Sequence, residues 1–453
     1  MKSRTLGIRP SSAIPRCVEI HDLGVELLGG LVVHAQPLLR HPLDGITVLE
    51  FATVIAGPLS AAFMADMGAR VIKVELPEGD PMRAMAGGQG TGGVKMTQGK
   101  ESICLDLKTP EAQTIVHKLI AKSDVLIHNY RPGVPERLGV DYETARKLNP
   151  KIVYLYAAGY GATGPYSQRP AFHPLPGALL GGALLQAGAG MPPPPDKELS
   201  WDELKEVSRW LSRANETNPD PNTAMLLATT MMLGLYAQAK TGTGQWCQVS
   251  MLGANAYANA DDFFAYQGKP ERPAPDAECY GLNATYRLYP AREGWVFLAC
   301  LFEEEWQVFC CTVGREDLLQ DPRFATAEAR QANDDALARV LGEIFKARAA
   351  GEWEALLTAQ DVACVRADEY TIGQFFEESQ HSWENNFVKE TDHLRFGTYW
   401  RHSGLAHFSR TPGRHGPGVL AGQHSRQLLH ELGYSDEEIA DLKSRSVVNW
   451  EDP

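Results

Sequence analysis

Short apolar runs of strand length alternate with segments of helical spacing from about residue 41 onward. The strand-like runs are Ile46–Phe51, Val71–Glu75, Ser102–Leu107, Val125–His128, Ile152–Tyr156 and Gln245–Met251. The helix-like segments are Gly57–Met67, Pro110–Ala121, Leu199–Ala214, Thr223–Ala239 and Asn255–Tyr266. Strands that alternate with helices form right-handed βαβ units. The sequence therefore predicts an α/β fold with a mostly parallel sheet.

The pattern changes at Gly268–Asp276, a segment rich in proline and charge. Beyond it, Thr285–Tyr289 and Trp295–Cys300 flank a turn and predict a β-hairpin, and the chain to about His393 is charged and helix-rich. We expect four parts. They are an N-terminal extension (1–40), a large domain (41–267), a smaller α+β domain (268–410) and a C-terminal segment that returns to the large domain (411–453).

Composition narrows the class of protein. The 453 residues include 43 Lys and Arg against 56 Asp and Glu, a net charge of −13, which argues against nucleic-acid binding. No apolar run reaches the roughly 18 residues that a membrane-spanning helix needs, so no membrane association is expected. None of the eight cysteines forms a C-x-x-C pair, which favours a reduced, cytoplasmic protein.

Two glycine strings mimic a dinucleotide-binding fingerprint. They are Gly88, Gly90, Gly93 and Gly159, Gly161, Gly164. The fingerprint needs a strand before it and a helix directly after it, and neither string has both. The histidine pairs also lack a third ligand at a suitable spacing. We therefore expect neither NAD, FAD nor a metal.

Seven short segments occur in order and carry more information together than any one of them alone. They are VIAGP at 54–58, KVELPEGDPMR at 73–83, KESICLDLK at 100–108, NYRPG with RLG at 129–139, GYGATGP at 159–165, TGTGQWCQV at 241–249 and GQH at 422–424. This ordered set resembles the class III CoA-transferases, which include formyl-CoA transferase, carnitine CoA-transferase and α-methylacyl-CoA racemase. The resemblance covers about residues 43–447.

The resemblance implies a Rossmann-like large domain, a small domain, an interlocked-ring dimer and coenzyme A bound as a substrate thioester. Carried over by position, the CoA-binding residues are Val54, Ile55 and Ala56 along the adenine and pantetheine path, Leu105 and Lys108 around the nucleotide, Asn129 and Tyr130 at the pantetheine, and Arg137 at a phosphate. Arg83 is a further phosphate candidate. Lys108 and Arg137 offer charge-assisted donors of the kind that phosphates need. Taken alone, Lys108 would also fit a solvated surface lysine, and Arg137 would also fit an ion pair on a helix surface.

One residue departs from the family pattern. The family's aspartate, which attacks the acyl-CoA thioester, follows the Gly-Pro of the GYGATGP segment by nine residues, and counting from Gly164 gives His173. No Asp or Glu occurs between Gly164 and Met191. Three readings stay open: a silent subunit whose paralogue carries the aspartate, a working His173, and a CoA-binding or scaffolding protein without turnover. A distant carboxylate such as Asp261 or Asp262 is a fourth.

The first reading is our expectation. It describes a subunit of a hetero-oligomeric CoA-transferase that moves CoA from a dicarboxylyl-CoA such as succinyl-CoA to an organic acid. The nearest resemblance is to the aspartate-lacking subunit of benzylsuccinate CoA-transferase, which suggests an aromatic succinate as acceptor. The alternatives are the scaffolding protein and an acyl-CoA racemase or isomerase that uses His173. The insertion 191–222 fits either packing on its own domain or contact with a partner.

Overall fold

The computed structural model describes residues 40–85, 93–173, 175–180, 198–203, 219–258, 264–271, 273, 275–276, 278, 280–367, 372–403 and 405–451. The predicted N-terminal extension (1–40) lies outside this part except for its last residue. Most of the 191–222 insertion, with all but a few residues of its expected helix, also lies outside it, as do Asp261 and Asp262.

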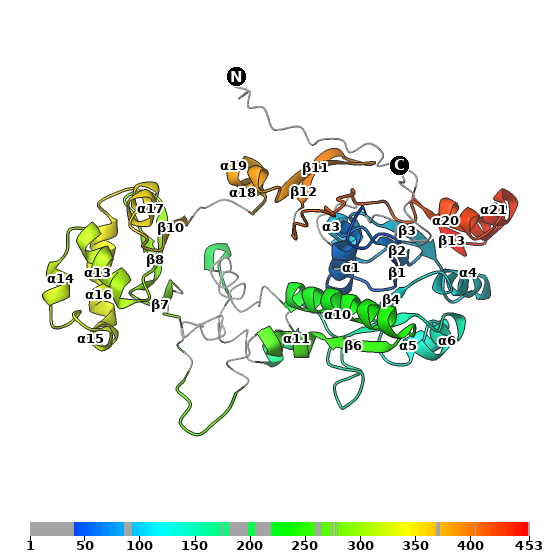
Figure 1. The fold of residues 1–453 in the computed structure, drawn as a ribbon, viewed down its shortest axis with the longest axis horizontal. Coiled ribbons are helices and arrows are strands. Elements are labelled where there is room, and N and C mark those ends of the chain that lie inside the picture. The colour runs from blue at the N-terminus through cyan, green and yellow to red at the C-terminus, as the bar shows by residue number, and fades with distance from the viewer. Residues whose placement is uncertain are drawn as a thin grey trace, which may run out of the picture. The chain divides into compact units, whose positions relative to one another are not determined.

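A seven-stranded sheet forms the centre of the part that the sequence predicts to be a large domain, and we keep that name for it (Figure 1). Its strands are β1 Thr47–Glu50, β2 Arg70–Glu75, β3 Glu101–Leu105, β4 Val125–His128, β5 Val153–Ala158, β6 Trp246–Ser250 and β13 Val448–Asn449. The order is β13-β3-β2-β1-β4-β5-β6, and every pairing is parallel except that of β13 with β3. The predicted α/β fold with a mostly parallel sheet is confirmed.

Helices cover both faces of this sheet, because its strands are apolar on both sides. One face packs on α1 (Ala56–Asp66), α10 (Pro219–Thr241) and α11 (Met251–Ala258). The other packs on α4 (Pro110–Ile120), α6 (Tyr142–Leu148), α20 (Ser425–Glu431) and α21 (Asp436–Ser444). The connection from β2 to β3 contains the short helices α2 (Met82–Met85) and α3 (Val94–Thr97), and α5 (Val134–Leu138) follows β4.

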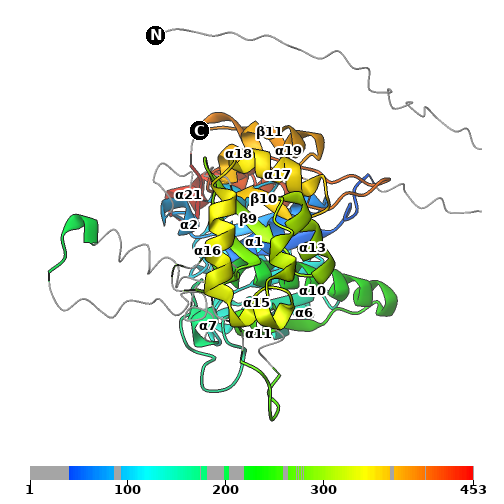
Figure 2. The same ribbon diagram turned by 90° about the vertical axis from the view of Figure 1, so that its left-hand side faces the viewer.

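A four-stranded antiparallel sheet has its own core (Figure 2). Its strands are β7 Gly281–Asn283, β8 Tyr286–Pro290, β9 Trp295–Ala299 and β10 Cys364–Ala367. Its helices are α13 Glu303–Thr312, α14 Asp317–Gln320, α15 Ala327–Ala332, α16 Asp334–Phe345 and α17 Ala350–Thr358. Rings of Trp306, Phe309, Phe345 and Trp353 stack or meet edge to face inside it. The predicted hairpin of residues 285–300 is present as β8 and β9.

A second hairpin, β11 Val388–His393 and β12 Gly397–His402, was not expected from the sequence. Its strands carry exposed charges and no continuous apolar run, so periodicity gave no signal for it. Two short helices, α18 Ile372–Glu378 and α19 Gln380–Glu384, precede it. The helix expected over Asn255–Tyr266 starts earlier and ends at Ala258, as far as the described residues show.

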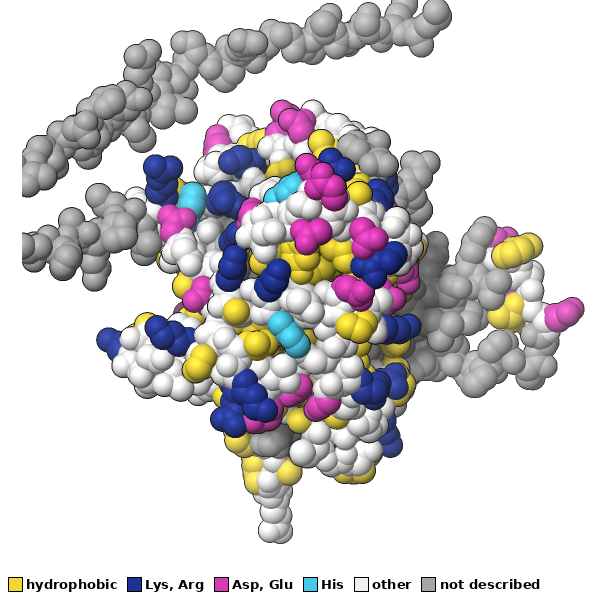
Figure 3. Space-filling model, turned by 90° about the vertical axis from the view of Figure 1, so that its right-hand side faces the viewer, with side chains coloured by type: hydrophobic (Ala, Val, Ile, Leu, Met, Phe, Trp, Pro, Cys, Tyr) yellow, Lys and Arg dark blue, Asp and Glu magenta, His cyan; other side chains and the backbone are white. Residues whose placement is uncertain are grey.

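The surface carries mixed charge. On the face seen in Figure 3, the described Lys and Arg side chains alternate with Asp and Glu and do not gather into one basic stripe. No helix in the described ranges is long and apolar enough to cross a bilayer.

The β11–β12 hairpin is tied to α1 by a buried ion pair. Arg401 Nη2 lies 2.5 Å from Asp66 Oδ2, and both side chains are at least nine-tenths buried. Arg401 also donates to the Gly416 carbonyl. A buried charge that loses its partner costs far more than an exposed one, so this pair fixes the hairpin's place on the large domain.

We expect Arg401→Ala to lower the free energy of unfolding by about 3–5 kcal/mol, because Asp66 would keep a buried charge without its partner. Denaturant unfolding followed by circular dichroism measures this. The matched control is Arg292→Ala, which breaks the exposed pair with Glu352 and should cost less than about 1 kcal/mol. Equal losses in the two variants would contradict the proposed tie.

Candidate functional site

The strand order reverses between β1 and β4. To one side of this point the chain runs β1-β2-β3, and to the other it runs β4-β5-β6. Open parallel sheets bind ligands at the carboxyl ends of their strands at such a switch point, because the two flanking loops diverge there. The loops in question are Phe51–Ile55 after β1 and Asn129–Gly133 after β4. Both come from the motif set that the sequence singled out.

Asn129 joins these two loops. Its Oδ1 accepts from the Thr53 N–H at 3.1 Å, and its Nδ2 donates to the Thr53 carbonyl at 2.9 Å. One side chain thus satisfies both backbone groups of a residue that belongs to no strand or helix. The separation of the loops is fixed by this pair of bonds.

Val54 has a backbone φ of 72°. A β-branched residue in this left-handed region is strained by about 1–3 kcal/mol, and such strain persists only where the surroundings enforce it. Asp80 is part of that enforcement, because its Oδ1 accepts from the Val54 N–H at 3.3 Å and from the Met82 N–H at 2.9 Å. Ile55 then forms the N-cap of α1 without a side-chain cap, and the helix begins at Ala56.

Buried charges lie beneath this segment. Lys73 Nζ lies 3.0 Å from Glu50 Oε1 and 2.9 Å from Asp80 Oδ2, and Lys100 Nζ lies 2.5 Å from Glu50 Oε2. All four side chains are 3% exposed or less. The two lysines also donate to carbonyls at the start of α1 and just before it, those of Ala52 and Pro58.

The two lysines respond differently to their burial. For Lys73, desolvation by itself would lower the pKa, but the charges of Glu50 and Asp80 outweigh it and raise the pKa. For Lys100, desolvation prevails over the attraction of Glu50, and the charge of Lys73 acts in the same direction, so its pKa falls to about 8. Lys73 is therefore the firmly charged centre of the network.

The guanidinium of Arg83 is bonded to other groups of the protein in this structure. Its guanidinium forms a two-pronged bond with Glu75, at 2.8 and 2.7 Å, and donates to the Val419 carbonyl at 2.8 Å. The residue is 8% exposed. The sequence suggested a phosphate contact for Arg83. The structure pairs its charge with Glu75, and a role at the CoA phosphates stays a prediction.

The other sequence candidates lie at the end of β3 and in the segments that follow β3 and β4. Lys108 follows β3 and Arg137 lies in α5, and both side chains are exposed. Leu105 is fully buried in the core, so only its backbone can border a ligand. Tyr130 is half-buried and packs against that core. Two exposed cations thus belong to segments that follow strands of the sheet, and an anionic ligand would need such donors. The roles themselves stay predictions.

His173 lies at the end of β5. A Cβ on Gly159, directly after this strand, would lie 2.3 Å from the Cβ of Ala171, so the glycine allows the 171–173 segment to approach. His173 Nδ1 lies 2.7 Å from Asp220 Oδ2. The histidine side chain is 28% exposed and the aspartate side chain 7%. A buried carboxylate therefore holds the imidazole that the sequence count predicts at the family's aspartate position.

Asp220 was missed by the sequence analysis. It lies 47 residues from His173, in a stretch that reads as a linker because of its prolines. In the structure it belongs to the first turn of α10, a longer helix than the expected Thr223–Ala239. An aspartate that heads a long helix was the available signal, since acidic residues are favoured there.

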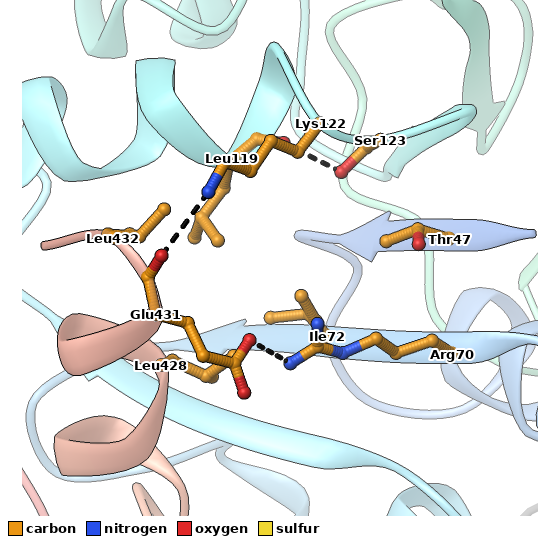
Figure 4. A pocket seen from close by; sticks show the side chains of 9 residues that line it. All are labelled: Thr47, Arg70, Ile72, Leu119, Lys122, Ser123, Leu428, Glu431 and Leu432. Carbon is orange, nitrogen blue, oxygen red and sulfur yellow. Dashed lines mark hydrogen bonds and ion pairs between the residues drawn. The ribbon is translucent and has the colours of Figure 1, made fainter.

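A small cavity of about 50 Å³ lies at the opposite edge of the sheet (Figure 4). Thr47 and Arg70, which line it, are the first residues of β1 and β2. Arg70 pairs there with Glu101 and Glu431, at 2.8 and 2.6 Å. The cavity thus lies where α20 packs on the sheet, away from the switch point.

Comparison with known proteins decides the family. The profile of CoA-transferase family III matches residues 43–425. The chain belongs to CoA-transferase family III. The family resemblance read from the sequence is thereby confirmed, and CoA thioesters are the substrates typical of such enzymes.

Individual members of the family are similar over most of the chain. Acetyl-CoA:oxalate CoA-transferase of Acetobacter aceti is 28% identical over 69% of this chain and 77% of its own. The succinyl-CoA–L-malate CoA-transferase beta subunit of Chloroflexus aurantiacus is 28% identical over 90% and 98%. Among solved structures, Rv3272 from M. tuberculosis (TM-score 0.70, 25% identity, 86% and 99% covered) and a CaiB/BaiF family protein from Brucella suis (0.70, 25%, 87% and 100%) share the fold.

We expect Asn129→Ala to weaken the binding of a CoA thioester about tenfold, roughly 1.4 kcal/mol, because the loop after β1 loses both of its bonds to the loop after β4. Isothermal titration with acetyl-CoA measures this. Asn149→Ala is the matched control, since Asn149 also bonds backbone carbonyls, those of Ile120 and Ser123, near the amino ends of the strands. A similar loss of affinity in the control would contradict the assignment of the site to the carboxyl edge.

A second expectation concerns His128 at the end of β4. The ring is 3% exposed and stacks on Tyr156 at 5.0 Å, and desolvation lowers its pKa to about 3. Between about pH 6.5 and pH 3, His128 therefore binds a proton in the unfolded chain and stays unprotonated in the native chain. Stability falls as pH falls through this window, by about 1.4 kcal/mol per pH unit from this group.

Urea unfolding of the native sequence and of His128→Phe at several pH values between 4 and 7 tests this. The phenyl ring keeps the stacking but does not titrate. The slope of unfolding free energy against pH should drop by about 1.4 kcal/mol per unit in the variant. Identical slopes would show that His128 becomes protonated in the native state.

Proposed function

We propose that this chain is a subunit of a class III CoA-transferase that moves CoA from a dicarboxylyl-CoA such as succinyl-CoA to an organic acid. The observation that carries this is the combination of a family-type fold with His173 in place of the nucleophilic aspartate. The chain supplies the large-domain framework, and a paralogous subunit supplies the aspartate. The two subunits together form the interlocked assembly that the family resemblance implies.

The proposed substrates follow from the relatives. Similar curated proteins include a succinyl-CoA:glutarate CoA-transferase of Homo sapiens and a succinyl-CoA–D-citramalate CoA-transferase of Chloroflexus aurantiacus, 25% and 26% identical over 90% of this chain. Their names share a succinyl donor and a carboxylic acid acceptor. For the present chain we extend the acceptor class to aromatic succinates.

CoA would lie across the switch point. Lys108 and Arg137 are suited to its phosphates because both cations are exposed and can reach an anion. The strained 54–56 segment and the Asn129–Tyr130 pair would border the adenine and pantetheine. A loop held rigidly by Asp80 and Asn129 meets its ligand without an ordering cost.

An exposed apolar face on α10 supports a subunit partner. Met225, Leu226, Leu233 and Tyr236 of this helix are all exposed in the single chain. Apolar side chains gathered on one helix face are typical of surfaces that another subunit covers. We assign this face to the paralogous subunit.

A second candidate function is favoured by the His173–Asp220 contact. A histidine held by a carboxylate is suited to acid–base work, which fits an acyl-CoA racemase or isomerase. A CoA-binding scaffold without turnover is the outcome in which neither activity is found.

We expect CoA exchange between succinyl-CoA and an acid acceptor only when this chain is co-expressed with a family paralogue that carries the aspartate. Replacing the partner's aspartate by alanine should abolish exchange, by about 10³-fold or more, because in this proposal that aspartate forms the acyl anhydride. Chromatographic separation of CoA esters over a panel of acids measures the exchange. His173→Gln in this chain is the matched variant and should leave exchange intact.

Two results would overturn the proposal. The first is exchange by the lone chain that disappears in His173→Gln. The second is a mixed assembly that turns over equally well without the partner's aspartate.

A further inference from the structure

We propose that His173 and Asp220 form a general-base pair that activates water against an acyl-CoA thioester, giving this chain a hydrolytic activity of its own. The inference rests on the CoA binding in the proposed function and does not need the paralogous subunit. His173 is the catalytic residue in this proposal, and Asp220 is a positioning residue that acts through it.

The geometry assigns the two ring nitrogens different tasks. Nδ1 lies 2.7 Å from a carboxylate oxygen that is almost completely buried, so Nδ1 carries the proton and donates it to Asp220. Nε2 then keeps its lone pair. No described residue forms a hydrogen bond with Nε2, and the side chain is 28% exposed, so in this proposal Nε2 is the nitrogen that meets water.

The carboxylate is held firmly. Asp220 lies in the first turn of α10, and the fully buried Asn255 of α11 fixes that turn. Asn255 Nδ2 donates to the Met251 carbonyl at 2.7 Å and to the Pro219 carbonyl at 3.5 Å. Asn222 lies two residues after Asp220 in α10, and its Nδ2 donates to Asn255 Oδ1 at 3.3 Å. The aspartate therefore sits on a rigid element and can orient the ring of its partner.

A base at this position suits one kind of acyl acceptor. An organic acid is already a carboxylate at neutral pH and has no proton for a base to take. Water must lose a proton as its oxygen attacks a carbonyl carbon, and an imidazole held by a carboxylate accepts that proton well. The dyad thus points to an acceptor with an O–H bond.

The reaction balances without any further reactant. Nε2 takes a proton from water while the water oxygen bonds to the thioester carbonyl carbon. The tetrahedral intermediate then collapses, the C–S bond breaks, and the imidazolium returns its proton to the departing CoA sulfur. The products are a carboxylic acid and the free CoA thiol, and His173 is regenerated.

The test measures release of CoA thiol from acetyl-CoA and from succinyl-CoA by the purified full-length chain, with no acid acceptor present. In H₂¹⁸O the released acid should gain one ¹⁸O. His173→Gln and Asp220→Asn should each lower kcat about 10²–10⁴-fold with KM unchanged, because substrate binding does not involve the dyad. Imidazole added to His173→Gly should restore turnover, which a structural role would not allow.

His430→Gln is the matched control. His430 Nε2 also lies near a carboxylate, 3.3 Å from Asp436 Oδ1, but this pair is exposed on the C-terminal helices. The control should hydrolyse thioesters at the native rate. Circular dichroism on every variant separates loss of chemistry from loss of fold, and Asp220→Asn keeps the shape of the side chain it replaces.

Three results would overturn the inference. The first is hydrolysis at the native rate in both dyad variants. The second is a loss of hydrolytic activity in the variants that comes from KM alone. The third is His173-dependent exchange of the acyl α-hydrogen with D₂O without thiol release. The last would assign the base to a C–H bond. If hydrolysis fails while paralogue-dependent exchange persists, the proposed function stands alone. If CoA thioesters do not bind at all, both proposals fail.

Discussion

The carboxyl edge of the large sheet depends on four charged side chains that are closed off from water: Glu50, Lys73, Asp80 and Lys100. Burying each ion without a partner would cost several kcal/mol of folding free energy, and removing one member would leave the others with an uncompensated buried charge. Two cations and two carboxylates neutralise one another, with every pair within 3.0 Å. These residues come from β1, β2, the loop after β2 and the position before β3, so their mutual pairing ties these segments together.

The shape of the candidate site follows from that network. Lys73 holds Asp80, Asp80 holds the Val54 N–H, and the chain at Val54 is kept in a conformation that valine avoids. Asn129 holds the same loop from the β4 side. The loop is therefore set by buried polar groups before any ligand arrives, which is how a site avoids an ordering cost on binding.

Patterns of apolar residues in the sequence were enough to predict those elements whose burial requires a continuous apolar run. All six parallel strands and the β8–β9 hairpin could be predicted, because each leaves its period in the sequence. The β11–β12 hairpin could not, since its position depends on Arg401 meeting Asp66, a contact over 335 residues. The same limit explains Asp220. Its partner, His173, lies 47 residues away in the sequence, and a charged side chain does not reveal by itself which group it pairs with.

The two activities assigned to this chain make opposite demands on water. An acyl anhydride survives only in a dry site, whereas the His173–Asp220 pair needs water beside it. Phe172, Leu175 and Leu179 next to the histidine are exposed apolar residues in the single chain. A subunit that covered them would exclude water from Nε2 while leaving the bond to Asp220 in place. Assembly with a partner would then decide whether the bound thioester is hydrolysed or protected, with no change in the residues that hold CoA.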